Sequence, residues 1–225
     1  MAARVAIYYA PLPRDPLTDL SSAWLGRDPV SGAGVLQPNV DGIAEFTAEP
    51  RHYGFHATLK PPMRLPDGTD WFGFVAAVRT MAADIAPFLL PRLAVTDLRG
   101  FLALRETEPC ASLQTLADAC VERVDSFRVP PSGAELARRR RSGLSAEQDA
   151  MLVRWGYPYV FGTWFFHMTL TRRLSDAEKA AVLPAAEAWF APALAAERWV
   201  EDICLFTQAS PDAAFVLAER VRLRG

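Results

Sequence analysis

Two of the three histidines in this chain begin the same four-residue pattern, His-x-Thr-Leu. The pattern stands once as His-Ala-Thr-Leu at residues 56–59 and again as His-Met-Thr-Leu at residues 167–170. A repeat around two of only three histidines is hard to reach by chance, and it indicates two equivalent half-sites that come together. A general acid paired with a general base is the chemistry that this arrangement serves best, because the reference pKa of histidine is about 6.5.

The faces of the two motifs follow from strand geometry, in which side chains at positions i and i+2 lie on the same side. The leucine and the residue between histidine and threonine should then point to the core. If the two polar faces meet, they present two imidazoles and two hydroxyl groups. The expected faces are His56, Thr58 and Lys60 in the first strand, and His167, Thr169 and Thr171 in the second.

This set of side chains suits the cleavage of a phosphodiester. One neutral histidine can accept a proton from an attacking water or 2′-hydroxyl, and the other, as an imidazolium, can donate a proton to the leaving alkoxide. The threonine hydroxyls can donate hydrogen bonds to the non-bridging oxygens as charge develops there. The scheme requires no metal and no cofactor.

Two other interpretations of the histidines remain open. A histidine beside a threonine is ordinary strand composition, so both motifs could be purely structural. Zinc is a second alternative, because histidine is a common ligand. His52 and His56 form the only closely spaced pair, however, and no cysteine pattern or HExxH-like motif completes a ligand set.

The composition limits the class of protein. Hydrophobic residues make up 51% of the 225 residues and charged residues 22%, which permits a sizeable core and argues against disorder. The net charge of −2 argues against a general nucleic-acid coat protein but leaves room for a small phosphate-containing substrate or an RNA end. The three cysteines match no zinc or disulfide framework, so we expect a reduced, cytoplasmic setting. No apolar run reaches the ~20 residues of a membrane span.

The order of expected elements echoes itself around the two motifs. Each motif strand is followed by a long helix and then by two strands, which predicts an α+β protein with two sheet-bearing lobes. Strands are expected near residues 5–10, 56–60, 92–97, 101–106, 164–172, 199–208 and 214–223, and helices near 15–25, 71–85, 111–127, 132–141, 145–155 and from 175 onward. Pro184 and Pro192 are expected to kink or divide the last helix, and residues 26–52 are expected to form a long loop with short helical pieces.

These residues resemble the two-histidine phosphoesterase superfamily, also called LigT-like, whose signature is a pair of His-x-Thr-hydrophobic motifs near strand ends. The resemblance covers most of the chain. Three stretches are similar to the branch associated with bacterial phosphonate metabolism: Ile7–Pro11, Arg51–Pro62, and Trp155–Val160 with Phe166–Thr171.

The resemblance implies a fold, an activity and site residues. The fold would be one domain over residues 1–225, in which two antiparallel-sheet lobes related by pseudo-twofold symmetry enclose a central cleft. The activity would be a metal-independent phosphodiesterase or cyclic phosphodiesterase. His56 and His167 would be the acid–base pair, and Thr58 and Thr169 would bind phosphate. The association with phosphonates suggests a cyclic or ester phosphate, such as a phosphoribosyl cyclic phosphate, as substrate.

Further residues could contact a substrate, and each also has an ordinary structural explanation. Tyr8 is expected to face the cleft because its neighbours in the first strand face the helices. Arg105 could face the site, and Tyr53 and Tyr159, which flank the motifs, could stack on a base or sugar. Lys60 and Thr171 share the motif faces. The run at residues 138–141, four consecutive arginines, is expected on a solvated helix face.

Two rival functions remain open from the sequence. The first is a 2′,3′-cyclic nucleotide or RNA-end phosphodiesterase. The second is a non-catalytic regulator that binds a phosphate ligand, although binding alone would not need two proton-transfer groups. We expect a monomer that has no membrane contact.

Overall fold

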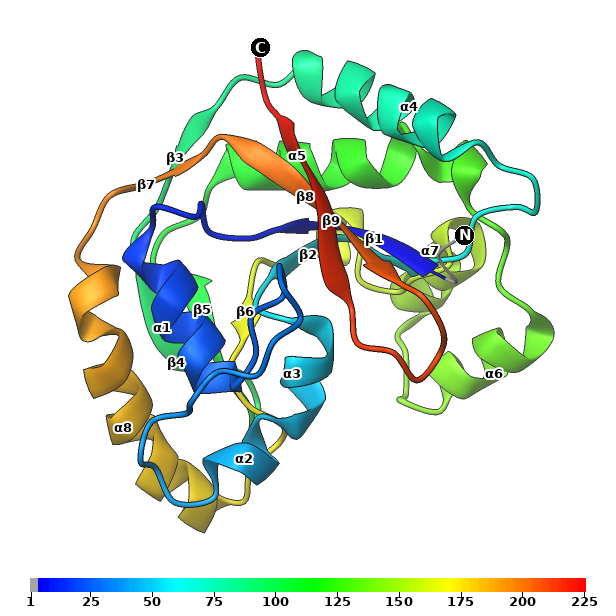
Figure 1. The fold of residues 1–225 in the computed structure, drawn as a ribbon. Helices are drawn as coiled ribbons and strands as arrows, with labels where there is room; N and C mark the ends of the chain where they lie inside the picture. Colours follow the sequence, from blue (N-terminus) through cyan, green and yellow to red (C-terminus); the bar gives the residue numbers. More distant parts are fainter. Residues whose placement is uncertain (1–3) are drawn as a thin grey trace.

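The computed structural model describes residues 4–225, and its centre is a seven-stranded sheet (Figure 1). The strands lie in the order β4-β5-β6-β2-β1-β8-β9, and β3 pairs with β7 in a separate two-stranded sheet. Every pairing is antiparallel. The strands are β1 (Arg4–Tyr9), β2 (Ala57–Met63), β3 (Phe88–Leu90), β4 (Leu93–Asp97), β5 (Leu102–Glu106), β6 (Met168–Thr169), β7 (Arg198–Val200), β8 (Asp202–Gln208) and β9 (Val216–Arg222).

Helices surround this sheet, and five of them share one continuous hydrophobic core with it. These five are α1, α2, α4, α5 and α8, and α5 packs directly on the central strand β2. The Asp70 carboxylate starts α4 by accepting the backbone N–H groups of Phe72 and Gly73. The helices are α1 (Pro16–Leu25), α2 (Ile43–Phe46), α3 (Ala48–Tyr53), α4 (Trp71–Ala83), α5 (Ala111–Glu122), α6 (Gly133–Arg140), α7 (Ala146–Trp155) and α8 (Asp176–Leu194), with short 3-10 turns at Asp125–Phe127 and Phe161–Thr163.

The two faces of the sheet have different surroundings, as β1 shows. Val5, Ile7 and Tyr9 face the main core beneath the helices. Ala6 and Tyr8 face the other way, into a smaller cluster that also contains Phe206 and Phe215. The alternation follows the period of two that a strand imposes. The side chains of the second face are therefore the ones available to a site outside the main core.

The element order repeats in the two halves of the chain. The segment β2-α4-β3-β4-β5 is followed by β6-α8-β7-β8-β9, with the three helices α5, α6 and α7 between them. Equivalent strands pair with each other: β2 with β6, and β3 with β7. Antiparallel pairing of equivalent elements is what a local twofold relation between the halves produces.

The expected α+β class with antiparallel strands is confirmed. The two expected sheet regions are continuous, because the β2–β6 pair joins them into one sheet. The second motif strand, expected over residues 164–172, is only β6 (Met168–Thr169). A 3-10 turn ends just before the expected strand, at Thr163, and the strand pattern stops after β6 because the amides of Leu170 and Thr171 both donate to the Leu102 carbonyl. The expected loop at 26–52 contains two short helices, α2 and most of α3.

Candidate active site

The two motifs lie side by side at the centre of the sheet. Ala57 of the first motif pairs with Met168 of the second in antiparallel register. That register puts His56 beside Thr169 and Thr58 beside His167. Ala57 and Met168 are buried in the main core, so the histidines and threonines occupy the opposite face. Strand pairing thus gathers the four motif side chains into one group.

The His56 ring is held in one orientation by its backbone and by an aromatic neighbour. Its Nδ1 lies 2.8 Å from the carbonyl oxygen of Gly54, which can only accept, so Nδ1 carries a proton. In the neutral ring, Nε2 is then unprotonated and accepts a hydrogen bond from the Thr58 hydroxyl at 3.2 Å. The Tyr8 ring stacks on the imidazole with centroids 3.7 Å apart. Nε2 is therefore the atom available for proton transfer.

His167 is held in the same way. Its Nδ1 donates to the carbonyl of Phe165 at 3.2 Å, again the residue two positions earlier in the chain. The Phe165 ring stacks on the imidazole at 4.7 Å, and Phe101 meets it edge-on at 6.0 Å. Both motifs therefore fix the same tautomer of histidine and leave Nε2 unprotonated.

Burial lowers the pKa of both histidines. Loss of hydration lowers the pKa of His56 to about 4. The hydrogen bond to the Gly54 carbonyl acts in the opposite direction and raises the pKa, whereas a positive charge on nearby His167 lowers it further. Burial also lowers the pKa of His167, against its bond to Phe165, and the Arg105 guanidinium lowers it further. Both rings are thus neutral near pH 7 in the free protein, and a bound phosphate anion would raise their proton affinity.

The low pKa of His56 predicts a measurable effect on stability. Between pH 6.5 and 4 the unfolded chain binds a proton at this ring that the folded chain excludes, so the free energy of unfolding falls as the pH falls. At about 1.36 kcal/mol per pKa unit, the contribution is at most about 3 kcal/mol. Urea denaturation at pH 5 and pH 7 should show a smaller pH dependence in His56→Gln than in the wild type. Equal dependence in both proteins would contradict the assigned environment.

A cavity of about 960 Å³ opens over the motif face. Its floor includes His56, Thr58 and Thr169, and its walls include the aromatic rings of Tyr8, Tyr53, Phe101 and Tyr157. His167 is half-buried and lies outside the lining, but its ring contacts Phe101, which belongs to it. The cavity volume lies at the upper end of the range of about 300–1,000 Å³ for small-molecule sites.

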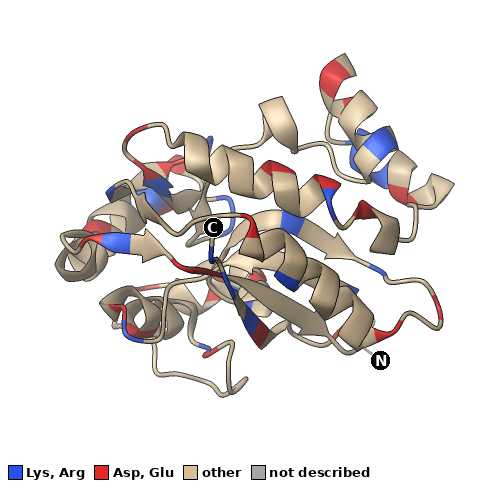
Figure 2. Cartoon of the chain, turned by 90° about the horizontal axis from the view of Figure 1, so that it is seen from above, with Lys and Arg blue, Asp and Glu red and all other residues tan. Residues whose placement is uncertain are grey.

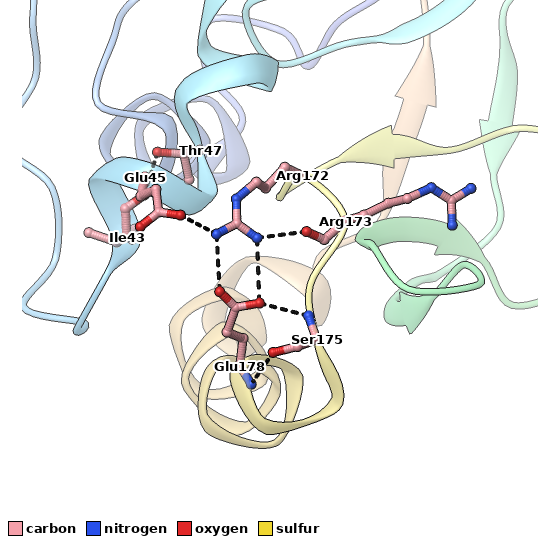
Figure 3. Close-up of polar contacts among 7 residues, drawn as sticks. All are labelled: Ile43, Glu45, Thr47, Arg172, Arg173, Ser175 and Glu178. Atoms are coloured by element: carbon pink, nitrogen blue, oxygen red, sulfur yellow. Dashed lines mark hydrogen bonds and ion pairs between the residues drawn. The ribbon is translucent and has the colours of Figure 1, made fainter.

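The cavity is rich in arginine, a feature that the motifs did not indicate. Arg4, Arg138, Arg139, Arg172 and Arg173 all line it, and Glu49 is the one acidic residue among the lining side chains within residues 4–225. Arg172 is bound by Glu45 and Glu178, the latter at 3.0 Å, and Figure 3 shows how these carboxylates hold its guanidinium. The excess of positive charge suits an anionic ligand.

Comparison with known proteins gives the family. A family model described as "Protein of unknown function (DUF1045)" matches residues 58–216, more than two thirds of the chain. The chain belongs to the DUF1045 family.

Two curated relatives match nearly all of this DUF1045 chain. One from Janthinobacterium sp. (strain Marseille), named ribose 1,5-bisphosphate phosphokinase PhnN, is 39% identical over 99% of the chain and 51% of its own length. One of the same name from Laribacter hongkongensis (strain HLHK9) is 37% identical over 98% of the chain and 52% of its own length. The chain spans about half the length of the curated relatives it matches.

Solved structures are similar at low identity. E. coli LigT complexed with NADP+ aligns over 100% of the DUF1045 chain and 99% of its own, with 15% identity and a TM-score of 0.48. LigT complexed with 3′-AMP aligns over 100% of both chains, with 12% identity and a TM-score of 0.47. A structure described as a phosphoesterase covers 99% of both chains, with 13% identity and a TM-score of 0.45.

Four of the weaker candidates lie near the motif residues. Tyr8 and Tyr53 line the cavity. Ala103 pairs with Thr169 and Leu104 with Met168, so the same register puts Arg105 next to His167. The Arg105 guanidinium lies 5.6 Å from the centroid of the Phe165 ring. Thr171 borders the cavity, but it is fully buried and its hydroxyl accepts the Leu102 amide at 3.0 Å, which is a structural contact.

The prediction that Lys60 faces the site with His56 and Thr58 is wrong. Thr58 pairs with Tyr8 and Lys60 with Ile7, so Leu59 is an extra residue and forms a β-bulge. The bulge turns Lys60 to the core face, where it is 2% exposed. Its ammonium donates to the Val121 carbonyl at 2.8 Å and to Asp125 at 3.2 Å.

Two expectations about flanking residues also change. Tyr157 lines the cavity. Tyr159 does not line the cavity but packs edge-on against the Tyr157 ring, with centroids 5.6 Å apart. The arginine run was expected on a solvated helix face; Arg140 pairs there with Asp149, but Arg138 and Arg139 border the cavity. Spacing along α6 could not reveal this, because it depends on where the whole helix packs.

Other features concern metals and membranes. Within residues 4–225, no three side chains of His, Cys, Asp or Glu come close enough together to hold a metal ion. None of the helices in that range is long and apolar enough to cross a membrane.

Proposed function

We propose that this chain is a metal-independent phosphodiesterase of the two-histidine type that opens cyclic phosphates. It would act as a single domain whose halves each supply one histidine and one threonine. The observation that carries the proposal is the antiparallel pairing of the two motifs, with both histidines anchored through Nδ1 to the carbonyl two residues earlier. This arrangement suits a paired acid and base, whereas a regulator would not need it.

The reaction follows from these positions. The neutral Nε2 of one histidine accepts a proton from water as the water oxygen bonds to phosphorus. The bond from phosphorus to the leaving oxygen breaks, and the other histidine, protonated at Nε2, donates its proton to that oxygen. Thr58 and Thr169 donate hydrogen bonds to the non-bridging oxygens. The products are a phosphate monoester and a free hydroxyl, and the two histidines end with their protonation states exchanged.

The relatives suggest a substrate. Their name specifies a kinase for ribose 1,5-bisphosphate, and the present chain matches about half of each. Water attack on a ribosyl 1,2-cyclic phosphate that bears a 5-phosphate, with cleavage of the bond to O2, yields ribose 1,5-bisphosphate. We propose this phosphoribosyl cyclic phosphate as the substrate, which would link the chain to phosphonate breakdown. The alternative is a 2′,3′-cyclic nucleotide or RNA end.

A panel of cyclic phosphates tests the proposal. The purified chain would be incubated with phosphoribosyl 1,2-cyclic phosphate, 2′,3′-cyclic nucleotides and an RNA ending in a cyclic phosphate, and the monoester product would be followed by phosphorus NMR. Preferred ring opening of the ribosyl compound supports the proposal, and preference for a nucleotide supports the alternative. Binding without turnover of any compound would indicate a regulator instead.

The threonines give a quantitative prediction. A hydroxyl that bonds a charged phosphate oxygen contributes about 1.5–3 kcal/mol. Thr58→Val and Thr169→Val should each lower kcat/KM by roughly ten- to a hundredfold. Thr80→Val is the control, because Thr80 is exposed on α4 and bonds only the Ala76 carbonyl. Wild-type kinetics in both motif variants would remove the threonines from the site.

A further inference from the structure

The arginines of the cavity are a local concentration of charge. The whole chain carries a net charge of −2, and Figure 2 shows basic and acidic residues interspersed over the ribbon. The cavity nevertheless collects five arginines against one glutamate. Such a local excess in an otherwise balanced molecule points to a ligand with more than one negative charge.

Three of the five arginines are occupied by the protein itself. Arg172 is bound by two carboxylates (Figure 3). Arg173 donates to the Arg99 carbonyl at 2.5 Å. Arg4 donates through Nε to the Gln208 side chain at 2.6 Å. These three guanidinium groups therefore have structural partners that fix them.

Arg138 and Arg139 differ from the others. Among residues 4–225, neither guanidinium forms a hydrogen bond or ion pair, although Arg140 beside them pairs with Asp149. Arg138 is exposed and Arg139 is half-buried. Both also border an adjoining recess that is lined by Arg64, Arg128 and Glu135; there Arg64 pairs with Glu135 and Arg128 with Asp125.

A wall of aromatic rings connects these arginines with the motif face. The Arg139 guanidinium lies 4.9 Å from the centroid of the Tyr157 ring, a cation–π contact that orients it. Burial raises the pKa of the Tyr8 phenol, and the nearby Tyr53 and Tyr157 phenols raise it further. Tyr8 in turn stacks on His56. The arginines thus line the same cavity as His56, Thr58 and Thr169 but sit on a different element, α6.

We propose that Arg138 and Arg139 bind a second phosphate group of the substrate, distinct from the phosphodiester that is cleaved. The identity of the cleaved group rests on the proposed function, whereas the second subsite rests on the placement of these two arginines. A guanidinium presents a planar fork of donors that matches phosphate oxygens. The site would therefore select cyclic phosphates that carry a separate terminal phosphate over those that lack it.

Equilibrium binding tests the subsite without requiring turnover. Isothermal titration would compare ribose 1,5-bisphosphate with ribose 1-phosphate in the wild type, in Arg138→Gln/Arg139→Gln and in the control Arg140→Gln. Each partly exposed arginine should contribute about tenfold to the affinity for the second phosphate group. The wild type and the control should therefore bind ribose 1,5-bisphosphate roughly tenfold to a hundredfold more tightly than ribose 1-phosphate. The double variant should show a preference of only a fewfold.

The outcomes separate this subsite from the proposed hydrolase. An arginine-dependent preference without turnover of any cyclic phosphate would support the subsite and overturn the hydrolase. Turnover without the preference, or a preference that the double variant retains, would overturn the subsite and leave the hydrolase standing. Failure of the wild type to bind either ribose phosphate would also overturn the subsite.

Discussion

Replacing either motif histidine with alanine is expected to lower kcat on a cyclic phosphate by about 10²–10⁴-fold, the usual contribution of a positioned acid or base. The expectation follows from the site, where each ring offers an unprotonated Nε2 and each Nδ1 is held by a backbone carbonyl. Because the two rings act as a unit, one accepting and the other donating a proton in the same reaction, the double variant should be little slower than the worse single variant. Steady-state kinetics on all three variants measures both effects.

The third histidine is a matched control. His52 bonds the Gln208 side chain at 3.1 Å and lies outside the cavity lining, so His52→Ala should keep kcat within a few-fold of the wild type. Loss of activity only in the His56 variant would mean that His167 is structural and that the site has a single proton-transfer group. Equal losses of activity in the His52, His56 and His167 variants would point to a general effect on folding.

Gly54→Ala is expected to damage both stability and activity. Gly54 has φ 77° and ψ 169°, a conformation that is essentially restricted to glycine, and an added Cβ would lie 2.7 Å from the Pro29 Cβ. The variant should lose at least about 2 kcal/mol of stability, which corresponds to roughly 4–8 °C in Tm for a chain of this size. The Gly54 carbonyl also orients His56, and a ring displaced by about 1 Å can cost about 10²-fold in kcat.

A second glycine serves as the comparison. Gly34 is exposed, and an added Cβ there would meet no atom within 4 Å, so Gly34→Ala should leave Tm and kcat nearly unchanged. Thermal unfolding and kinetics would be measured on both variants. If Gly54→Ala behaved like Gly34→Ala, the carbonyl of residue 54 would not be what positions His56.

Local sequence patterns predicted the parts of the site that depend on strand geometry alone. The period of two in each motif puts histidine and threonine on one face, and the structure places His56, Thr58 and Thr169 at one cavity. The same rule failed at Lys60, because it assumes a regular strand and Leu59 adds a bulge that turns the following residue over. A single sequence carries no local signal for that extra residue.

Features that depend on tertiary packing were beyond reach of the sequence. The pairing of β2 with β6 joins residues more than a hundred positions apart, so the crossed arrangement of His56 with Thr169 could not be derived from spacing. The position of α6 decides that Arg138 and Arg139 reach the cavity. Pro184 and Pro192 were expected to kink or divide the last helix, but α8 runs as one helix from Asp176 to Leu194.

The pH dependence of turnover in the presence of EDTA tests the central claim most directly. With one neutral and one protonated histidine required, kcat/KM of the wild type should follow a bell whose limbs belong to the coupled pair. Since burial lowers the pKa values of both histidines, the maximum of kcat/KM should lie below pH 6.5. The maximum of kcat should lie at higher pH, because bound phosphate favours the imidazolium form. His56→Ala and His167→Ala should each lose one limb. A bell retained in both variants, or activity abolished by EDTA and restored by a divalent ion, would contradict the two-histidine mechanism.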